Sequence, residues 1–585
     1  MLLQDHDQHS AAERGTRHAR QYGADLPGLL EYLPPRDASD LLYKSFVASI
    51  HPIIPLLHLP TFDEEYHRFW AWFNECDGRG PPRNILSENP SLLPLLFAVL
   101  FAGAVSCPSD ALKLQFGHTS RATTSSPLRE AAERTQNMVG FPRNPTTYSL
   151  TSFLIVQNLL VREEEPLASC SYISVAFRVA QAMGLHRDSS HFGLDPVETE
   201  MRRRIWWHII HTDVMISVPS GLPPSCLSDT IYDTRMIGEV KDSCIGRVEQ
   251  QLNPDFSGDR AADVQYSSTS DLDVFDVRLM VAVDRYSITS VLRRILRRQF
   301  DTTPLTQADF ASLKDEVDAL DFHISSRIDQ VRNISERQTG GHTYEGDFDP
   351  STFVTWAQLL LKLMVHKTYC ALFQPLVRET QHPMWARVRP ECIDHCQKFV
   401  RAFYEMCTSE PFRPYHWLYP GLYQPLNAAV VLLSDLLRSP QSSEAEQSMA
   451  LIDRLFSLIT TSSGVVSEDN GDLVERNLSE GGREAWALLR RPRRKAWEKA
   501  GRDPEFLWTE GGGSRSDYSP LIDSSRHAAA EPGLSMVSAE VQTPIAQNSG
   551  GLDNSEEGLY KVTSESLVDW DYLSGLDLLQ FNWMD

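Results

Sequence analysis

The pattern of apolar positions is most regular between residues 166 and 224, where it predicts two helices joined by a short loop. In the first helix, apolar residues recur at steps of three and four, the period of one buried helical face. These residues are Tyr172, Ala176, Val179, Ala180 and Met183. Pro166 suits a helix start, and Gly184 suits the left-handed residue that ends a helix.

The second predicted helix has apolar residues on two faces. It begins with an acceptor cap, Asp195, which is answered three residues later by Glu198. One face carries Met201, Ile205, Ile209 and Ile216, and the other carries Trp206, Ile210 and Val214. Proline and glycine residues between 219 and 224 end the helix. A helix with two apolar faces packs on more than one side, so we expect this one to be buried.

Two motifs with a fixed order and spacing lie within this helix pair. Residues 176–188 read AFRVAQAMGLHRD, and residues 200–213 read E-x-R-R-R-x-W-W-x(5)-D, followed by G-x-P at 221–223. Together they resemble the fungal-specific transcription factor domain, the middle homology region of fungal zinc-cluster regulators. The signature residues, which we expect to be structural, are Gly184, Leu185, His186, Arg187, Glu200, Arg203, Arg204, Trp206, Trp207, Asp213, Gly221 and Pro223. Leu222 stands where the family usually has arginine.

The resemblance implies a nuclear transcription regulator, often one that controls a biosynthetic gene cluster or a nutrient-use pathway. Zinc is expected in that family, held by six closely spaced N-terminal cysteines that present a helix to DNA. Here the first cysteine is Cys76, so this cluster is absent and direct DNA binding is in doubt. A small-molecule effector and a homodimer both remain open. The alternative is a DNA-free helical protein that binds a ligand or partner and modulates a related regulator.

The remaining pattern predicts an all-α fold. Helical periodicity covers residues 42–46, 66–73, 148–161, 274–300, 306–334, 353–373, 389–406 and 424–437. Residues 77–91, 108–128 and 228–270 are predicted to be loops, and no convincing β-hairpin is found. The longest apolar stretch, Leu92–Cys107, is shorter than the roughly 20 residues of a membrane span. It is expected to be a buried helix, and no membrane partner is expected.

We divide the chain into four parts. Residues 1–31 are expected to be a disordered arm, 32–500 one large helical domain, 501–560 a disordered linker, and 561–585 an activation segment. Among the 585 residues, 55 basic and 78 acidic side chains give a net charge of −23, which excludes a surface that binds nucleic acid throughout. The nine cysteines show no repeating spacing and are expected to be reduced thiols.

The last 25 residues alternate acids with large apolar side chains, which is typical of an activation segment that binds a coactivator. The residues expected to act are Asp569, Trp570, Asp571, Leu573, Leu576, Phe581 and Trp583. The alternative is a tail helix that docks on its own domain.

The chain contains two clusters of basic residues. Arg490, Arg491, Arg493, Arg494 and Lys495 form the only dense basic run, and Pro492 within it favours an extended nuclear import signal. A solvated helix terminus is the alternative. The arginines between 293 and 298 have helical spacing, and an ion-paired or solvated face is favoured there over phosphate contacts.

No enzyme signature is convincing. His186–Asp188 mimics the kinase catalytic loop but lacks its downstream asparagine, a glycine-rich loop and a D-F-G motif. Cys392, His395 and Cys396 share one helical face, yet zinc needs about four ligands, so core thiols are favoured. His51 and His58 are likewise expected to be packing residues. No catalytic residue and no cofactor are therefore predicted.

Overall fold

The structure is a computed structural model. It describes residues 26–76, 85–117, 121–160, 166–245, 274–339, 349–378, 383–418, 425–459, 480–504, 506–509 and 512–515. Almost every element among these residues is helical, so the predicted all-α fold is confirmed.

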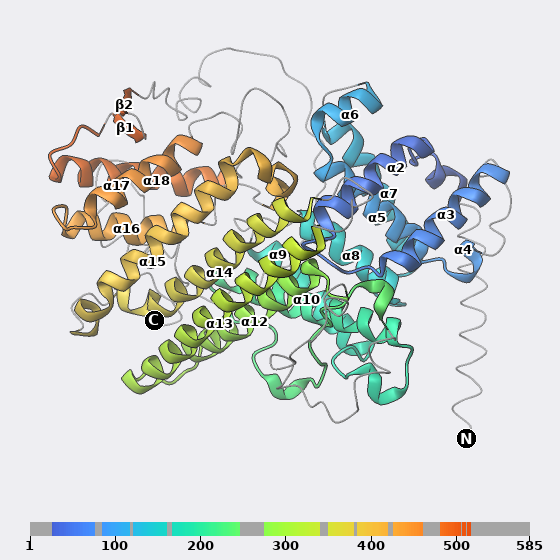
Figure 1. Ribbon diagram of the computed structural model, residues 1–585, viewed down its shortest axis with the longest axis horizontal. Helices are drawn as coiled ribbons and strands as arrows, with labels where there is room; N and C mark the ends of the chain where they lie inside the picture. Colours follow the sequence, from blue (N-terminus) through green and yellow to red (C-terminus); the bar gives the residue numbers. More distant parts are fainter. Residues whose placement is uncertain are drawn as a thin grey trace, which may run out of the picture.

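The helices follow the chain from one end of the molecule to the other (Figure 1). One end is built from α2 (Arg36–Ser45), the π-helical turn η1 (Phe46–Ile50), α3 (Leu59–Cys76), α4 (Ile85–Glu88), α5 (Leu92–Ser106), α6 (Ser109–Phe116), α7 (Arg121–Met138) and α8 (Thr147–Leu160). The centre is built from α9 (Pro166–Ala182), η2 (Ser189–Phe192), α10 (Pro196–Ser220), η3 (Asp229–Ile231), η4 (Asp242–Cys244), α12 (Val277–Gln299), α13 (Gln307–Thr339) and α14 (Pro350–Arg378).

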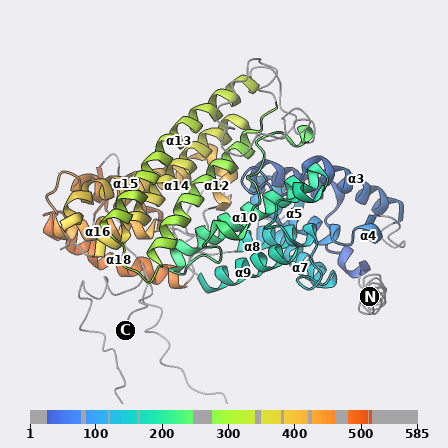
Figure 2. The same ribbon diagram turned by 90° about the horizontal axis from the view of Figure 1, so that it is seen from below.

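The other end is built from α15 (Pro383–Thr408), η6 (Glu410–Leu418), α16 (Leu426–Arg438), α17 (Ala445–Ile459) and α18 (Glu480–Lys499). The view from below shows the same order, with α12, α13 and α14 side by side between the two ends (Figure 2). The predicted helical ranges 306–334 and 353–373 correspond to α13 and α14.

Helix α5 is the hydrophobic centre of the first end. Every residue from Leu92 to Val105 is buried, and α2, α7 and α8 pack around it. Gly103 is required for the contact with α2, because a Cβ there would lie 1.9 Å from the carbonyl oxygen of Leu42. The expectation that 92–107 is a buried helix is confirmed.

No single helix in the described part of the chain has the length and composition of a membrane span; α5 and α6 reach them only together, as a pair bent by 116°.

The prediction of a loop at residues 108–128 is wrong, because α6 and the first turns of α7 lie there. Arg121, at the start of α7, donates hydrogen bonds to the carbonyl oxygens of Ala104, Val105 and Cys107 at 2.5 to 3.0 Å. It thereby satisfies carbonyl groups at the end of α5 that have no partner within the helix. Tertiary contacts thus fix a helix in a sequence rich in serine and threonine, whose own helix propensity is weak.

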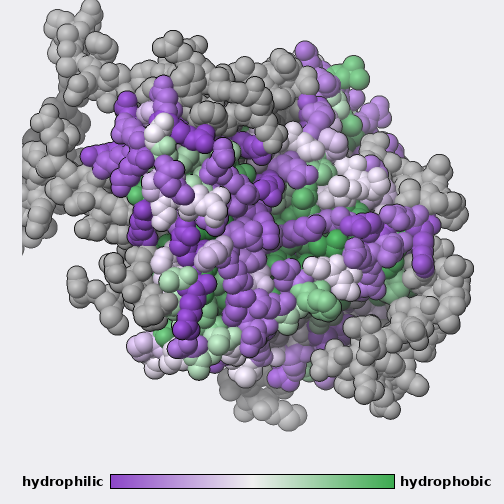
Figure 3. Space-filling model, turned by 60° about the vertical axis from the view of Figure 1, so that its left-hand side comes forward, coloured by the Kyte–Doolittle hydropathy of each residue, from purple (hydrophilic) through white to green (hydrophobic). Residues whose placement is uncertain are grey.

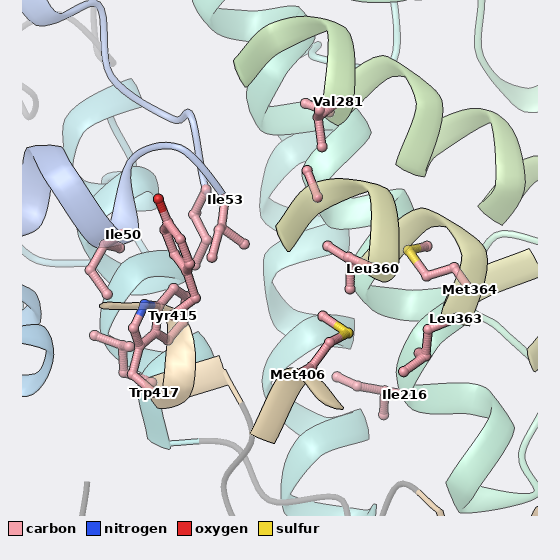
Figure 4. Close-up of a cluster of buried hydrophobic side chains, with 14 of the residues drawn as sticks. Ile50, Ile53, Ile216, Val281, Leu360, Leu363, Met364, Met406, Tyr415 and Trp417 are labelled. Carbon is pink, nitrogen blue, oxygen red and sulfur yellow. The ribbon is translucent and has the colours of Figure 1, made fainter. Parts of the chain in front are cut away.

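The core is continuous from one end of the molecule to the other. Figure 4 shows side chains from η1 and the turn after it, α10, α12, α14, α15 and η6 meeting in one cluster. Ile53, Ile216 and Met406 belong to it although they are far apart in sequence. The face shown in Figure 3 is mostly hydrophilic, with hydrophobic residues in small areas between polar ones. This is the surface expected when each helix buries one apolar stripe.

A short antiparallel hairpin follows the last helix. Strand β1 (Phe506–Thr509) pairs with β2 (Gly512–Arg515) and lies against α17. The sequence predicts a disordered linker at 501–560 and no hairpin, so the structure differs from the prediction at these strands. The physical reason is a tertiary contact, since α17 provides a surface against which a strand of only four residues can lie.

Candidate functional site

The two helices predicted around the signature are found as α9 and α10. The carboxylate of Asp195 accepts hydrogen bonds from the backbone N–H groups of Val197 at 3.0 Å and Glu198 at 3.4 Å, so the predicted cap is confirmed. The helix ends at Gly221, whose φ of 65° is the left-handed conformation that favours glycine. Both faces of α10 are buried, including Trp206 and Trp207.

Asp188 and Arg203 form a bidentate ion pair between the end of the first motif and α10. Arg203 Nε and Nη2 each donate to the Asp188 carboxylate at 2.8 Å. The same carboxylate accepts from the backbone N–H groups of Ser190 at 3.2 Å and Arg235 at 2.9 Å. Burial alone would raise the pKa of Asp188, but Arg203 and these donors hold it well below its usual range. Asp188 therefore remains an anion inside the protein.

A second group of ion pairs is centred on Arg204, the residue that follows Arg203 on α10. Arg204 donates from Nε to Glu200 at 3.1 Å and from Nη2 to Asp242 at 2.7 Å. It also donates to the carbonyl oxygen of Leu57 at 3.3 Å. The Glu200 carboxylate accepts from the N–H of Gly238 at 3.0 Å. Arg204 thus joins α10 to the turn before α3 and to the chain around residue 240.

The remaining signature residues hold the same neighbouring segment. Asp213 accepts from the backbone N–H groups of Ser225 and Cys226, both at 3.0 Å. Trp207 Nε1 donates to the carbonyl oxygen of Arg235 at 2.8 Å. Trp206 is fully buried, with its ring centroid 5.6 Å from those of both Phe177 and Tyr232. The His186 ring is tilted against the same indole, with the two ring centroids 6.2 Å apart.

Together these contacts define a structural unit, which we call the α10 clamp: Asp188, Glu200, Arg203, Arg204, Trp207 and Asp213. The clamp holds residues 225–242, which cross the surface of α10 with only short helical turns. An irregular segment cannot pair its own backbone groups, and a buried N–H without an acceptor is costly. The clamp carboxylates accept from four such N–H groups, on Ser225, Cys226, Arg235 and Gly238. The signature residues therefore position a loop.

The sequence does not reveal the partners in this clamp. Residues 228–270 are predicted to be a loop, and Glu200, Arg203 and Arg204 are identified only as signature residues. All three side chains are buried, and the partners that matter, Asp188 and Asp242, lie outside the helix. The only signal available was the high density of charge on a helix with two apolar faces.

A group of neutral histidines adjoins the clamp. Arg285 donates to His211 Nε2 at 2.9 Å, and Asn158 donates to His208 Nε2 at 2.9 Å. Burial, together with the charge of Arg285, lowers the pKa of His208 to about 3. Burial also lowers the pKa of His51 to about 4. These imidazoles are therefore uncharged near neutral pH.

His51 and His58 are packing residues. His51 Nε2 hydrogen-bonds the carbonyl oxygen of Leu57 at 3.1 Å, and His58 Nδ1 lies 2.7 Å from Thr61 Oγ1. In the described part of the chain, no group of three or more His, Cys, Asp or Glu side chains could hold a metal ion. Cys392, His395 and Cys396 are buried at the contact of α15 with α14, where His395 Nδ1 lies 3.1 Å from His366 Nδ1. The residues that the structure describes do not provide the ligand set of the family's zinc cluster.

The dense basic run lies within α18, so the extended conformation inferred from Pro492 is wrong. Pro492 is accommodated inside the helix. Arg493 is buried, and its Nε donates to the carboxylate of Asp453 on α17 at 2.7 Å. Its guanidinium also lies 4.7 Å from the ring centroid of Trp497. The exposed members of the run are Arg491, Arg494 and Lys495, whereas Arg490 is half-buried.

Three of the four arginines between 293 and 298 on α12 form ion pairs, as favoured from the sequence. Arg293 is buried and contacts Asp229 and Tyr232. Arg294 pairs with Glu316 at 2.7 Å, and Arg298 pairs with Asp309 at 2.7 Å. These contacts join α12 to η3 and to α13. They leave Arg293 unavailable to phosphate.

The fold and the α10 clamp define a large all-helical protein whose signature residues support structure. Residues 43–246 match the family model described as "Fungal specific transcription factor domain", a range that contains the whole clamp and both motifs. Residues 43–246 therefore match the fungal-specific transcription factor domain, and the resemblance seen in the sequence is confirmed there.

The curated relatives are named as transcription factors. Transcription factor macR of Penicillium terrestre is 26% identical over 77% of this chain and 53% of its own length. Transcription factor yanR of Aspergillus niger is 32% identical over 43% of this chain and 31% of its own. The pyriculol/pyriculariol biosynthesis cluster transcription factor 1 of Pyricularia oryzae is 29% identical over 38% of this chain and 28% of its own length. The chain thus spans about half, or less, of the length of these relatives.

The predicted activation segment, including Asp569, Trp570, Asp571, Leu573, Leu576, Phe581 and Trp583, lies outside the described residues.

Proposed function

We propose that this protein is a nuclear transcription regulator that controls a dedicated pathway or biosynthetic gene cluster. The observation that carries the proposal is the match of residues 43–246 to the fungal-specific transcription factor domain. Support also comes from the relatives, one of which is named for a biosynthesis cluster. In this proposal the helical domain is a regulatory body that gates an acidic activation segment at residues 561–585.

The activation segment can be tested by tethering. Residues 566–585, fused to a foreign DNA-binding domain, should activate a reporter gene. The acids keep the segment soluble and attract basic coactivator surfaces, and the aromatic side chains provide apolar area that is buried on contact, at roughly 25 cal/mol per Å². Replacing Trp570, Phe581 and Trp583 with alanine should abolish activation.

The matched control changes charge and keeps the apolar side chains. Replacing Asp569 and Asp571 with asparagine should weaken activation without abolishing it. A silent fusion, together with a lower melting temperature for the full chain when 561–585 is removed, would instead identify the segment as part of the folded domain. In that case a DNA-free protein that binds a ligand or partner becomes the better hypothesis.

Gating predicts a difference between the full chain and the segment. Tethered full-length protein should activate less than residues 566–585 alone. Equal activity from both would show that the helical domain does not restrain the segment, while leaving activation itself intact.

A test of nuclear import through the basic run at 490–495 requires a variant that leaves the fold intact. Arg493 pairs with buried Asp453, so replacing the whole run would also damage the α17–α18 contact. The informative variant therefore replaces only Arg490, Arg491, Arg494 and Lys495 with alanine. This variant should move a fluorescent fusion to the cytoplasm while its melting temperature changes little. Nuclear accumulation that persists in the variant would contradict the assignment.

Direct DNA binding by this chain is expected to be weak and without sequence preference. The net charge is −23, and Arg294 and Arg298 on α12 are held by ion pairs. Purified protein should bind duplex DNA weakly, with a steep salt dependence and no discrimination between sequences. Nanomolar, sequence-selective binding would overturn this expectation.

A further inference from the structure

Three thiols meet where α14 packs against α15. Cys370 lies on α14, and its sulfur is 3.6 Å from that of Cys396 on α15. Cys392 lies one helical turn before Cys396, and its thiol also interacts with that of Cys396. The two helices run side by side at the junction between the centre of the molecule and its C-terminal end (Figure 1).

The three thiols differ in access to solvent. Cys392 and Cys396 are buried, whereas Cys370 is only half-buried. A diffusing oxidant therefore reaches Cys370 first. Contacts with Cys370 and Cys392, together with burial, raise the pKa of the Cys396 thiol well above its usual value. Cys396 thus remains a protonated thiol until a neighbouring sulfur is oxidised.

We propose that Cys370 and Cys396 are an oxidation site, at which a peroxide converts the two thiols into a disulfide that joins α14 to α15. The covalent S–S distance is about 2.05 Å, so the sulfurs need to approach by roughly 1.5 Å. Rotation of the half-buried Cys370 side chain supplies part of this movement, and small shifts of the two helices supply the rest. The inference is independent of the proposed function.

The reaction balances in two steps. The Cys370 thiolate attacks hydrogen peroxide, the O–O bond breaks, and hydroxide leaves and takes up a proton to become water. Cys370 is now a sulfenic acid. The Cys396 sulfur then attacks it, the S–O bond breaks, and a second water leaves with the proton from Cys396. Two sulfurs have lost two electrons in total, and the peroxide has gained them.

The test treats the folded full-length chain with hydrogen peroxide and maps its cysteines by mass spectrometry without reduction. A Cys370–Cys396 peptide should be the most abundant disulfide. Two cysteines are matched controls. Cys170 is half-buried like Cys370 but neighbours the hydroxyl of Ser220, and Cys407 is buried on α15 like Cys396. Dimedone should trap a sulfenic acid on Cys170, and Cys407 should remain reduced.

Variants separate the two steps. In Cys396→Ser, the dimedone adduct on Cys370 should increase several-fold, because the sulfur that resolves the sulfenic acid is missing. In Cys370→Ser, Cys396 should stay reduced. The proposal fails if the untreated variants are folded by circular dichroism and Cys370 is trapped equally with and without Cys396. It also fails if the wild-type chain forms no Cys370–Cys396 peptide. The wild-type measurement decides the matter even if neither variant folds.

Discussion

Two bidentate Arg–Asp pairs in this molecule have nearly the same local geometry and different surroundings. In the α10 clamp, Arg203 Nε and Nη2 each donate a hydrogen bond to the Asp188 carboxylate at 2.8 Å. Between α15 and α16, Arg389 holds Asp435 at 2.6 and 2.7 Å. The first carboxylate also accepts two backbone N–H groups, from Ser190 and Arg235, and so anchors irregular chain. The second pair joins two regular helices.

The different surroundings of Asp188 and Asp435 indicate what each buried carboxylate contributes to the fold. The helices α15 and α16 satisfy their own backbone groups, and their apolar faces already pack together. An ion pair there adds little that apolar side chains could not supply. Residues 225–242 have no such internal pairing, so the clamp carboxylates are acceptors that the backbone requires. The family signature is therefore concentrated where a loop, and not a helix, must be held.

The largest expected effect comes from replacing each pair with apolar side chains of similar size. Asp188→Leu with Arg203→Met leaves two backbone N–H groups without acceptors, at about 1–3 kcal/mol each. We therefore expect a loss of about 2–6 kcal/mol in the free energy of unfolding, measured in urea. Asp435→Leu with Arg389→Met should change it by less than about 1 kcal/mol. Equal losses in the two double variants would contradict the comparison.

Loss of the Trp206 indole, which packs against residues 225–242, should lower the free energy of unfolding nearly as much. Trp206 is fully buried between α9 and the segment, and a buried Trp→Ala change costs about 3–5 kcal/mol. Trp206→Ala should lose that stability and make residues 225–242 sensitive to limited proteolysis. The exposed His191 in η2 is the control, and His191→Ala should change neither. A Trp206→Ala variant with wild-type stability and wild-type resistance to proteolysis would show that the clamp holds residues 225–242 without the indole.

Acidification should weaken the protein through its buried histidines. The folded pKa of His51 is about 4 and that of His208 about 3, below the unfolded value of 6.5. Between pH 6.5 and about 4 the unfolded chain therefore binds more protons, and stability falls as pH is lowered. Each histidine contributes at most about 1.4 kcal/mol per pH unit. His51→Gln should reduce the slope of unfolding free energy between pH 6.5 and 5, as measured by urea titrations.

Below about pH 4 the carboxylates add to this effect. The folded pKa of Asp188 is depressed, so its contribution is present above the unfolded value of about 3.9 and is lost as pH falls further. A Tm that is constant from pH 7 to 4 would contradict the assignments of His51 and His208, and a Tm that falls no further below pH 4 would contradict that of Asp188.

The smallest effect is expected from an arginine on the same helix whose carboxylate partner is more exposed. Arg202 pairs with Glu198 at 2.8 Å, and the glutamate side chain is 40% exposed. Water screens such a pair, so Arg202→Ala should cost about 1 kcal/mol or less in urea unfolding. A cost as large as that of Arg203→Ala would show that position on α10, and not burial of the partner, sets the energy.

Much of this protein is determined by local sequence. The period of apolar residues predicts α9, α10, α12, α13, α14 and α15, because an amphipathic stripe carries that information within about 15 residues. The Asp195 cap and the end at Gly221 are equally local. The order and spacing of the two motifs indicate the family, because they are properties of the sequence alone.

Other features were decided only by the tertiary structure. Residues 121–128 became helical because Arg121 and Leu128 pack against other parts of the fold, which no local pattern reports. The basic run became a helix because Arg493 met Asp453 on α17. Asp188 and Asp242 became clamp residues because folding brought them to α10 from outside it. Such pairings depend on which segments meet in space, and a buried carboxylate and an exposed one look the same in a sequence.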